Sequence, residues 1–157
     1  RILIRKINMN IFEGIEHVFA EGISNRQYFE QGNYVVTIDT VFIHEKRLGG
    51  GKLFIVETVV TDSDNPNIKP GDKKNWVQSL SLPSALPRIK TFLGASMGLC
   101  TKSQLKEINS SITTDICNQA VSPKNPLKGK ILKLECVDKI SRTGKNFTQH
   151  VWRTING

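Results

Sequence analysis

The sequence has 157 residues, a formal net charge of +8 and 38% hydrophobic residues. This length and composition are typical of one soluble globular domain with a sizeable core. No apolar run approaches the ~20 residues that a membrane-spanning helix requires, and the first residues lack the features of a signal peptide. We therefore expect a cytoplasmic protein that does not enter a membrane.

The first 31 residues predict an irregular lead-in to the domain. Met9 is interpreted as the natural start, so that residues 1–8 come from an expression vector or from upstream sequence. Apolar residues that follow Met9 have a loosely helical spacing, but Gly14 and Gly22 disfavour a stable helix. We place the single domain at residues 32–157.

Three strand-like segments come next. Residues 33–45 are rich in β-branched and aromatic side chains, and alternate residues from Tyr34 onward form one apolar face. Residues 52–61 have the same character, so the two segments predict a long β-hairpin. After a turn-rich loop, a third strand is expected within residues 73–82.

The apolar period then changes from two residues to that of a helix. Leu86, Ile89 and Phe92 predict the apolar face of a helix that begins near Pro83. Further short helices are expected before Pro123, so we place a helical insert at about residues 83–122. Two more strands, 130–140 and 146–155, complete the predicted domain.

This order predicts a mainly β fold with a helical insert, strand–strand–strand–helix–strand–strand. It is the order of the OB-fold, a five-stranded, partly open Greek-key barrel. In that fold, the face of strands two and three binds oligonucleotides or oligosaccharides together with the loops that join strands 1–2 and 4–5. Here those two loops are residues 46–52 and 141–146, and both are cationic and contain glycine.

Positive charge also concentrates toward the end of the chain. From Pro123 onward there are eight Lys or Arg residues against two carboxylates. A basic surface concentrates polyanions and speeds their association. Together with the two loops, this pattern predicts a binding site for single-stranded DNA, with RNA left open as a ligand.

Non-specific single-strand binders combine cations that contact phosphates with aromatic rings that stack on bases. Aromatic residues lie close to the charges in this sequence, as where Trp76 follows two lysines. The predicted phosphate contacts and stacking residues are Lys46, Arg47, Lys52, Lys73, Lys74, Trp76, Arg142, Lys145, Phe147, Trp152, Arg153, Tyr34 and Phe54.

No catalytic, metal or cofactor motif accompanies this site. Cys100, Cys117 and Cys136 are widely spaced, and no Cys/His cluster suggests zinc or a disulfide framework. The triple glycine at 49–51 lacks the GK[ST] ending of a phosphate-binding loop. We therefore predict a protein that is not an enzyme and has no cofactor.

Two alternatives stay open. A metal-dependent nuclease would need converging carboxylates, for which Asp62, Asp64 and Asp72 in one loop are the candidates. A protein-interaction or assembly module of a replication or recombination complex would need no direct contact with nucleic acid. The sequence leaves homo-oligomerisation and contacts with replication or recombination proteins undecided.

The chain also resembles the small single-stranded DNA-binding proteins of bacteriophages and related mobile elements. The motifs that carry the resemblance are Ile11-Phe12-Glu13-Gly14, Gly32-Asn33-Tyr34, the hairpin from Lys46 to Val60, Pro70-Gly71-Asp72 before Trp76, Ile89-Lys90-Thr91-Phe92-Leu93, and Gly144-Lys145-Asn146-Phe147 before Trp152. The resemblance implies an OB-fold viral protein that coats single-stranded DNA during replication or recombination in the host cytoplasm. Many members end in an acidic tail, whereas this sequence ends in Arg153-Thr154-Ile155-Asn156-Gly157.

Overall fold

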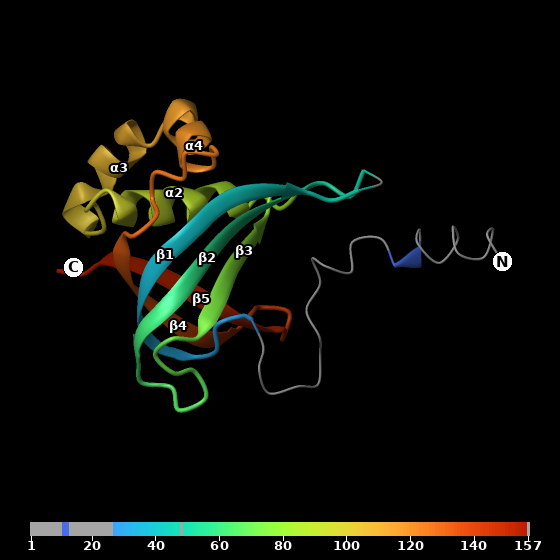
Figure 1. Ribbon diagram of the computed structural model, residues 1–157, viewed down its shortest axis with the longest axis vertical. Coiled ribbons are helices and arrows are strands. Elements are labelled where there is room, and N and C mark those ends of the chain that lie inside the picture. The colour runs from blue at the N-terminus through green and yellow to red at the C-terminus, as the bar shows by residue number, and fades with distance from the viewer. Residues whose placement is uncertain (1–10, 13–26, 48, 157) are drawn as a thin grey trace.

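The structure is a computed structural model that describes residues 11–12, 27–47 and 49–156. Met9, residues 1–8 and the glycines of the predicted lead-in lie outside these ranges. The elements in chain order are β1 (Gly32–Glu45), β2 (Lys52–Ser63), β3 (Lys73–Ser79), α2 (Ala85–Ser96), η2 (Lys102–Gln104), α3 (Leu105–Ser111), α4 (Thr114–Ala120), β4 (Ile131–Ile140) and β5 (Asn146–Thr154) (Figure 1).

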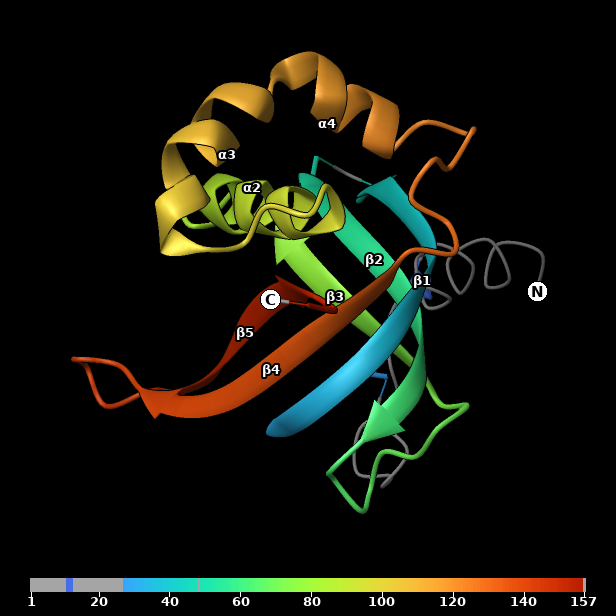
Figure 2. The same ribbon diagram turned by 90° about the vertical axis from the view of Figure 1, so that its left-hand side faces the viewer.

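The five strands form one antiparallel sheet in the order β3-β2-β1-β4-β5. Strand β1 lies at the centre, where it pairs with β2 along its length and with β4 through Gly32–Thr37. Two register shifts between β1 and β2 let the long strand bend, as bulges do. Figure 2 shows the resulting curled sheet, with β3 and β5 as its edge strands. The prediction of a mainly β fold is confirmed.

One of these shifts, between Ile38 and Thr40, is supported from the segment that precedes β4. The side-chain amide of Asn125 donates to the carbonyl of Asp39 at 2.7 Å, and its oxygen accepts from the Val41 N–H at 3.3 Å. Asn125 has a φ of 49°, the left-handed conformation that asparagine tolerates better than most residues. Asn125 therefore satisfies backbone groups of β1 beside the bulge.

The core lies between the concave side of the sheet and α2. Alternate side chains of β1, β2, β3 and β4 are buried there, together with Trp152 of β5, because successive residues of a strand point to opposite faces. Phe92 of α2 is fully buried and packs 4.9 Å from Trp152 and 5.5 Å from Trp76, measured between ring centroids. These rings hold α2 against the two edge strands.

The helices form a layer over one end of the sheet, with α3 and α4 beyond α2 (Figures 1 and 2). Ile89 and Phe92 of α2 are buried as predicted, but Leu86 is 68% exposed. The prediction for Leu86 was wrong because the helix begins at Ala85, whose own side chain takes the buried position in the first turn. None of the helices in the described ranges is long and apolar enough to cross a membrane.

Candidate nucleic-acid interface

The first cationic loop is the tip of the hairpin between β1 and β2. The Lys46 N–H donates to the Gly51 carbonyl at 2.8 Å and closes the loop, which leaves Lys46 and Arg47 exposed. Lys52 is also exposed, and its ammonium lies 3.3 Å from the Glu45 carboxylate. Leu48 lies outside the described residues. This tip therefore presents cations, and the Glu45 carboxylate partly neutralises the charge of Lys52.

The second cationic loop is the tip of a projecting ribbon. The ladder between β1 and β4 ends at Cys136, whereas β4 and β5 remain paired as far as Ile140 and Asn146. The ribbon turns at residues 141–145, where Ser141 donates to the Lys145 carbonyl at 2.8 Å and Gly144 has a φ of 82°. Residues 142–144 form a three-residue loop between Ser141 and Lys145. Such a loop needs one residue in the left-handed conformation, which glycine adopts without strain. Arg142 and Lys145 are exposed.

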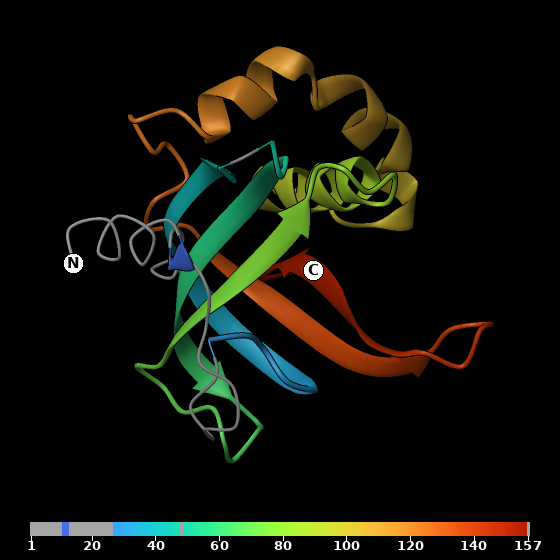
Figure 3. The same cartoon turned by 90° about the vertical axis from the view of Figure 1, so that its right-hand side faces the viewer.

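The two tips lie on the same side of the molecule but at separate corners of it. Figure 1 shows both on the right of the molecule, beyond β3. Figure 3 looks onto that side and shows the β1–β2 tip near the end of β3 and the β4–β5 tip far to its right. From the sequence we expect both loops to reach one groove. In this structure the tips stand at separate corners, so each tip is a candidate contact by itself.

Four of the five predicted stacking residues belong to the core. The exposed fraction is 2% for each of Tyr34, Phe54, Trp76 and Trp152. Each occupies a strand position that points toward the core, and Arg153, which follows Trp152, points to the opposite face. These rings are covered in this structure, and the prediction that they stack on bases is corrected. Phe147 differs, since 40% of its surface is exposed.

The predicted phosphate contacts divide in the same way. Lys74 is 3% exposed and lies on the inward side of β3, so it is not available as a surface contact. Lys73 is exposed, as is Arg153, whose guanidinium lies 3.7 Å from the Glu135 carboxylate. Arg142 and Lys145 of the ribbon tip keep their predicted exposure.

Sequence reasoning overlooked Lys139 as a candidate site residue. Lys139 is exposed on β4 and is the direct cross-strand partner of Phe147. Residues that are directly opposite in an antiparallel pair lie on the same face of the sheet. The alternation of Leu132, Leu134 and Cys136 in the core could have placed Lys139 on the outer face, but the pairing with Phe147 required the register.

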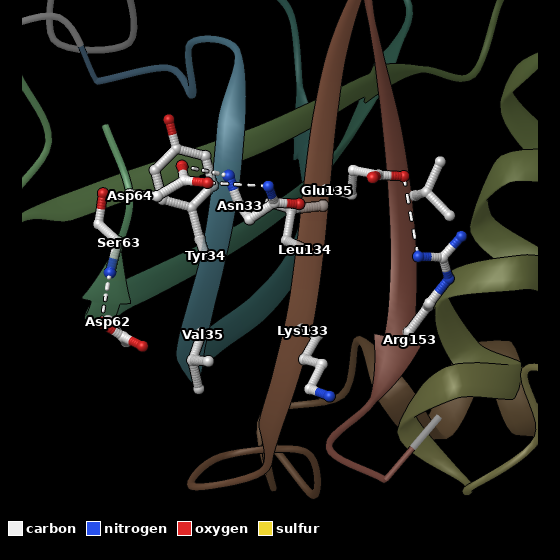
Figure 4. Close-up of a pocket in the computed structure, with 11 residues that line it drawn as sticks. Asn33, Tyr34, Val35, Asp62, Ser63, Asp64, Lys133, Leu134, Glu135 and Arg153 are labelled. Atoms are coloured by element: carbon white, nitrogen blue, oxygen red, sulfur yellow. Dashed lines mark hydrogen bonds and ion pairs between the residues drawn. The ribbon is translucent and has the colours of Figure 1, made fainter. Parts of the chain in front are cut away.

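A groove of about 360 Å³ lies on the outer side of the sheet over β1, β4 and β5 (Figure 4). Lys133 and Arg153, which are cross-strand partners, line one side of it. Asp62 and Asp64 line the opposite side. Asn33 donates to the Asp64 carboxylate from its backbone N–H at 2.7 Å and from its side chain at 2.8 Å, and these bonds lower the pKa of Asp64.

The carboxylates considered for a nuclease have local structural partners. Asp62 accepts from the Ser63 N–H at 2.9 Å and Asp72 accepts from the Lys69 N–H at 2.9 Å, as turn residues do. Within the described ranges, no group of three or more His, Cys, Asp or Glu residues is placed to hold a metal ion.

Burial shifts the pKa of three groups near the core toward their neutral forms. Burial raises the pKa of Cys136 to about 12, with a further contribution from the nearby Asp138 and Glu135 carboxylates. Burial likewise raises the pKa of Tyr34 to about 12. His150 has its pKa lowered to about 4, first by burial and then by the charge of Arg88. None of these groups is arranged as a nucleophile with an adjacent base.

Comparison with protein-family models and with curated protein sequences finds no match to this chain.

Proposed function

We propose that this protein binds single-stranded DNA without sequence specificity, in DNA replication or recombination. The observation that carries the proposal is the β4–β5 ribbon, which extends past the sheet with Arg142 and Lys145 exposed and Phe147 partly exposed. Cations that contact phosphates and an aromatic ring that stacks on a base are the two components of single-strand binding, and stacking contributes about 1–3 kcal/mol per base. The net charge of +8 adds long-range attraction.

The strand arrangement supports an OB-fold as the finer description of the domain. Strand β1 pairs with both β2 and β4, the helices lie between β3 and β4 in the chain, and the sheet curls until its edge strands meet through aromatic side chains. In OB-folds the 1–2 and 4–5 loops contact the ligand, and these are the two cationic hairpins of this chain. The proposal extends to membership of the bacteriophage single-stranded DNA-binding proteins, acting in the host cytoplasm.

Fluorescence anisotropy of labelled oligonucleotides tests the proposal. Oligo-dT should bind at low salt more tightly than a duplex of equal length, because a duplex cannot offer its bases for stacking. The affinity should fall steeply as salt rises from about 50 to 200 mM, since phosphate contacts release counterions. Oligo-U, measured in parallel, decides between DNA and RNA preference.

A folded protein that binds none of these oligonucleotides at low salt would contradict the proposal and favour an assembly module. Circular dichroism and a cooperative thermal transition establish that the protein is folded. Incubation of the same oligonucleotides with Mg²⁺ tests the nuclease alternative, and we expect them to remain intact.

A further inference from the structure

The outer face of β4 and β5 combines cations and an aromatic ring along one continuous track. Leu132, Leu134 and Cys136 of β4 point into the core, so the outward positions belong to Lys133, Glu135, Val137 and Lys139. On β5, Trp152 points into the core, so the outward positions belong to Phe147, Gln149, Val151 and Arg153.

The register places these side chains in pairs. Lys133 lies opposite Arg153 at one end of the track, and Lys139 lies opposite Phe147 near the ribbon tip. Lys139 lies six positions after Lys133, which is about 20 Å at ~3.4 Å per residue of strand. Among the described residues, no carboxylate forms an ion pair with Lys133 or Lys139. Both ammonium groups are therefore available to an anionic ligand.

The groove on the outer side of the sheet lies at the end of this face that is far from the ribbon tip. Figure 4 shows Lys133 and Arg153 beside one another on neighbouring strands, with Asp62 and Asp64 across β1 from them. The side formed by β4 and β5 carries Lys133 and Arg153 together with Glu135, whose carboxylate lies 3.7 Å from the Arg153 guanidinium, and the other side carries two carboxylates. Phosphates are attracted to the side formed by β4 and β5, and the carboxylates of Asp62 and Asp64 on the other side repel them.

The outer face of β2 and β3 lacks these components. Its outward positions in the register include the pairs Ile55 with Val77 and Glu57 with Asn75. Within the strands that the structure describes, this face has no aromatic side chain, and its cation beyond the β1–β2 loop is Lys73. Part of the β3 edge is also occupied, since the Asn75 N–H donates to the Gln27 carbonyl at 2.6 Å.

We propose that a bound single strand lies along the outer face of β4 and β5, from Phe147 near the ribbon tip to the groove beside Lys133 and Arg153. This path rests on the proposed function and specifies where the ligand runs. A base stacks on the exposed surface of Phe147 and Lys139 contacts a phosphate beside it. Lys133 and Arg153 contact phosphates about 20 Å further along the strand. The face of β2 and β3 does not carry the strand.

The stacking contact is tested by two alanine variants on opposite faces of the same ribbon. Ile140 is 73% exposed and lies opposite Asn146, on the face away from Phe147. Phe147→Ala should weaken oligo-dT binding about tenfold, and Ile140→Ala should leave it within twofold of wild type. Equal affinities of the two variants would overturn the path.

The phosphate contacts are tested by the double variant Lys133→Gln/Lys139→Gln. It should reduce the slope of log K against log salt by about 1.4, because each phosphate contact on a single strand contributes about 0.7. The matched control is Lys102→Gln/Lys106→Gln, which removes the same charge from exposed positions of η2 and α3. A control that lowers the slope as much as the test variant would show that only net charge matters.

The Phe147→Trp variant provides a direct readout. Its new indole should be quenched by oligo-dT, and an unquenched indole in a complex that still forms would place the bases elsewhere. Wild-type protein that binds no oligonucleotide contradicts the proposed function itself. Wild-type binding with normal behaviour of every outer-face variant contradicts only the path.

Discussion

The indole rings of Trp76 and Trp152 lie 5.5 Å apart at an interplanar angle of 70°, and they join β3 to β5. These are the two edge strands of the sheet, and the order of the described strands does not pair them. The closure of the curled sheet therefore depends on side-chain packing at this seam. Both indole N–H groups are buried without a hydrogen-bond partner among the described residues, so the rings contribute through apolar contact.

Removal of either indole should destabilise the domain. We expect Trp152→Ala and Trp76→Ala to lower the free energy of unfolding by about 3–5 kcal/mol, measured by urea denaturation. Phe147→Ala is the control, because an exposed aromatic should contribute less than about 0.5 kcal/mol. If the Trp152→Ala protein kept the stability of wild type but bound DNA more weakly, Trp152 would have to contact the DNA, contrary to this prediction.

The two cationic hairpins should differ in their effect on DNA binding. Arg142→Gln/Lys145→Gln should weaken oligo-dT binding and flatten its salt dependence more than Arg47→Gln/Lys52→Gln does. The reason is that Glu45 already neutralises part of the Lys52 charge at 3.3 Å, which reduces what that lysine can offer a phosphate. Anisotropy titrations at several salt concentrations measure both effects. A larger loss from the β1–β2 hairpin would reverse this ranking.

Stability should depend on pH through His150. Its pKa of about 4 lies below the ordinary value of 6.5, so the unfolded chain takes up a proton that the folded protein excludes. Above pH 6.5 the contribution of neutral His150 to the free energy of unfolding is complete. It is lost as the pH falls from 6.5 toward 4, which lowers the free energy of unfolding by up to about 3 kcal/mol. Urea midpoints at pH 7.5, 6 and 4.5 measure the loss.

The His150→Gln variant is the control for this prediction, because its side chain does not titrate. It should lose the part of the pH dependence that lies between pH 6.5 and 4. If wild type and variant lose stability in parallel over that range, the acid sensitivity comes from other groups.

Asn125 should contribute to stability through its two bonds to β1. Asn125→Ala removes the partners of the Asp39 carbonyl and the Val41 N–H, at a cost of about 1–3 kcal/mol. Asn125→Gly removes the same bonds but accepts the φ of 49° without strain, so it should be the less destabilised variant. Thermal denaturation compares the two, and an alanine variant as stable as wild type would show that the bonds contribute nothing.

Local patterns in the sequence predicted much of the fold. The alternation of Tyr34, Val36 and Ile38 identified the buried face of β1 as far as the bulge, and all three side chains are buried. Beyond the bulge the alternation shifts by one residue, so Val41 is buried and Phe42 is only half-buried. The helical spacing of Ile89 and Phe92 identified the inner face of α2 in the same way. These features follow from neighbours in the sequence, because the period of a strand or helix decides which residues share a face.

The same periodicity could not tell which face of a strand meets the core and which meets a ligand. Trp76 and Trp152 stand beside lysine and arginine in the sequence, and proximity in the chain suggested a shared surface. In the sheet, adjacent residues point to opposite sides, so Trp152 faces inward and Arg153 faces outward. On β3, Lys74 shares the inward side with Trp76, and Lys73 faces outward. Only the closure of the sheet shows which side becomes the interior.

The sequence by itself determined the strands, the helical segment between them, the two cationic hairpins and the excess of positive charge, since all of these are properties of local composition and spacing. The tertiary structure decided that the two tips stand at separate corners and that Lys139 lies opposite Phe147. The physical reason is that register and curvature depend on pairing between segments distant in the chain, which no local pattern encodes.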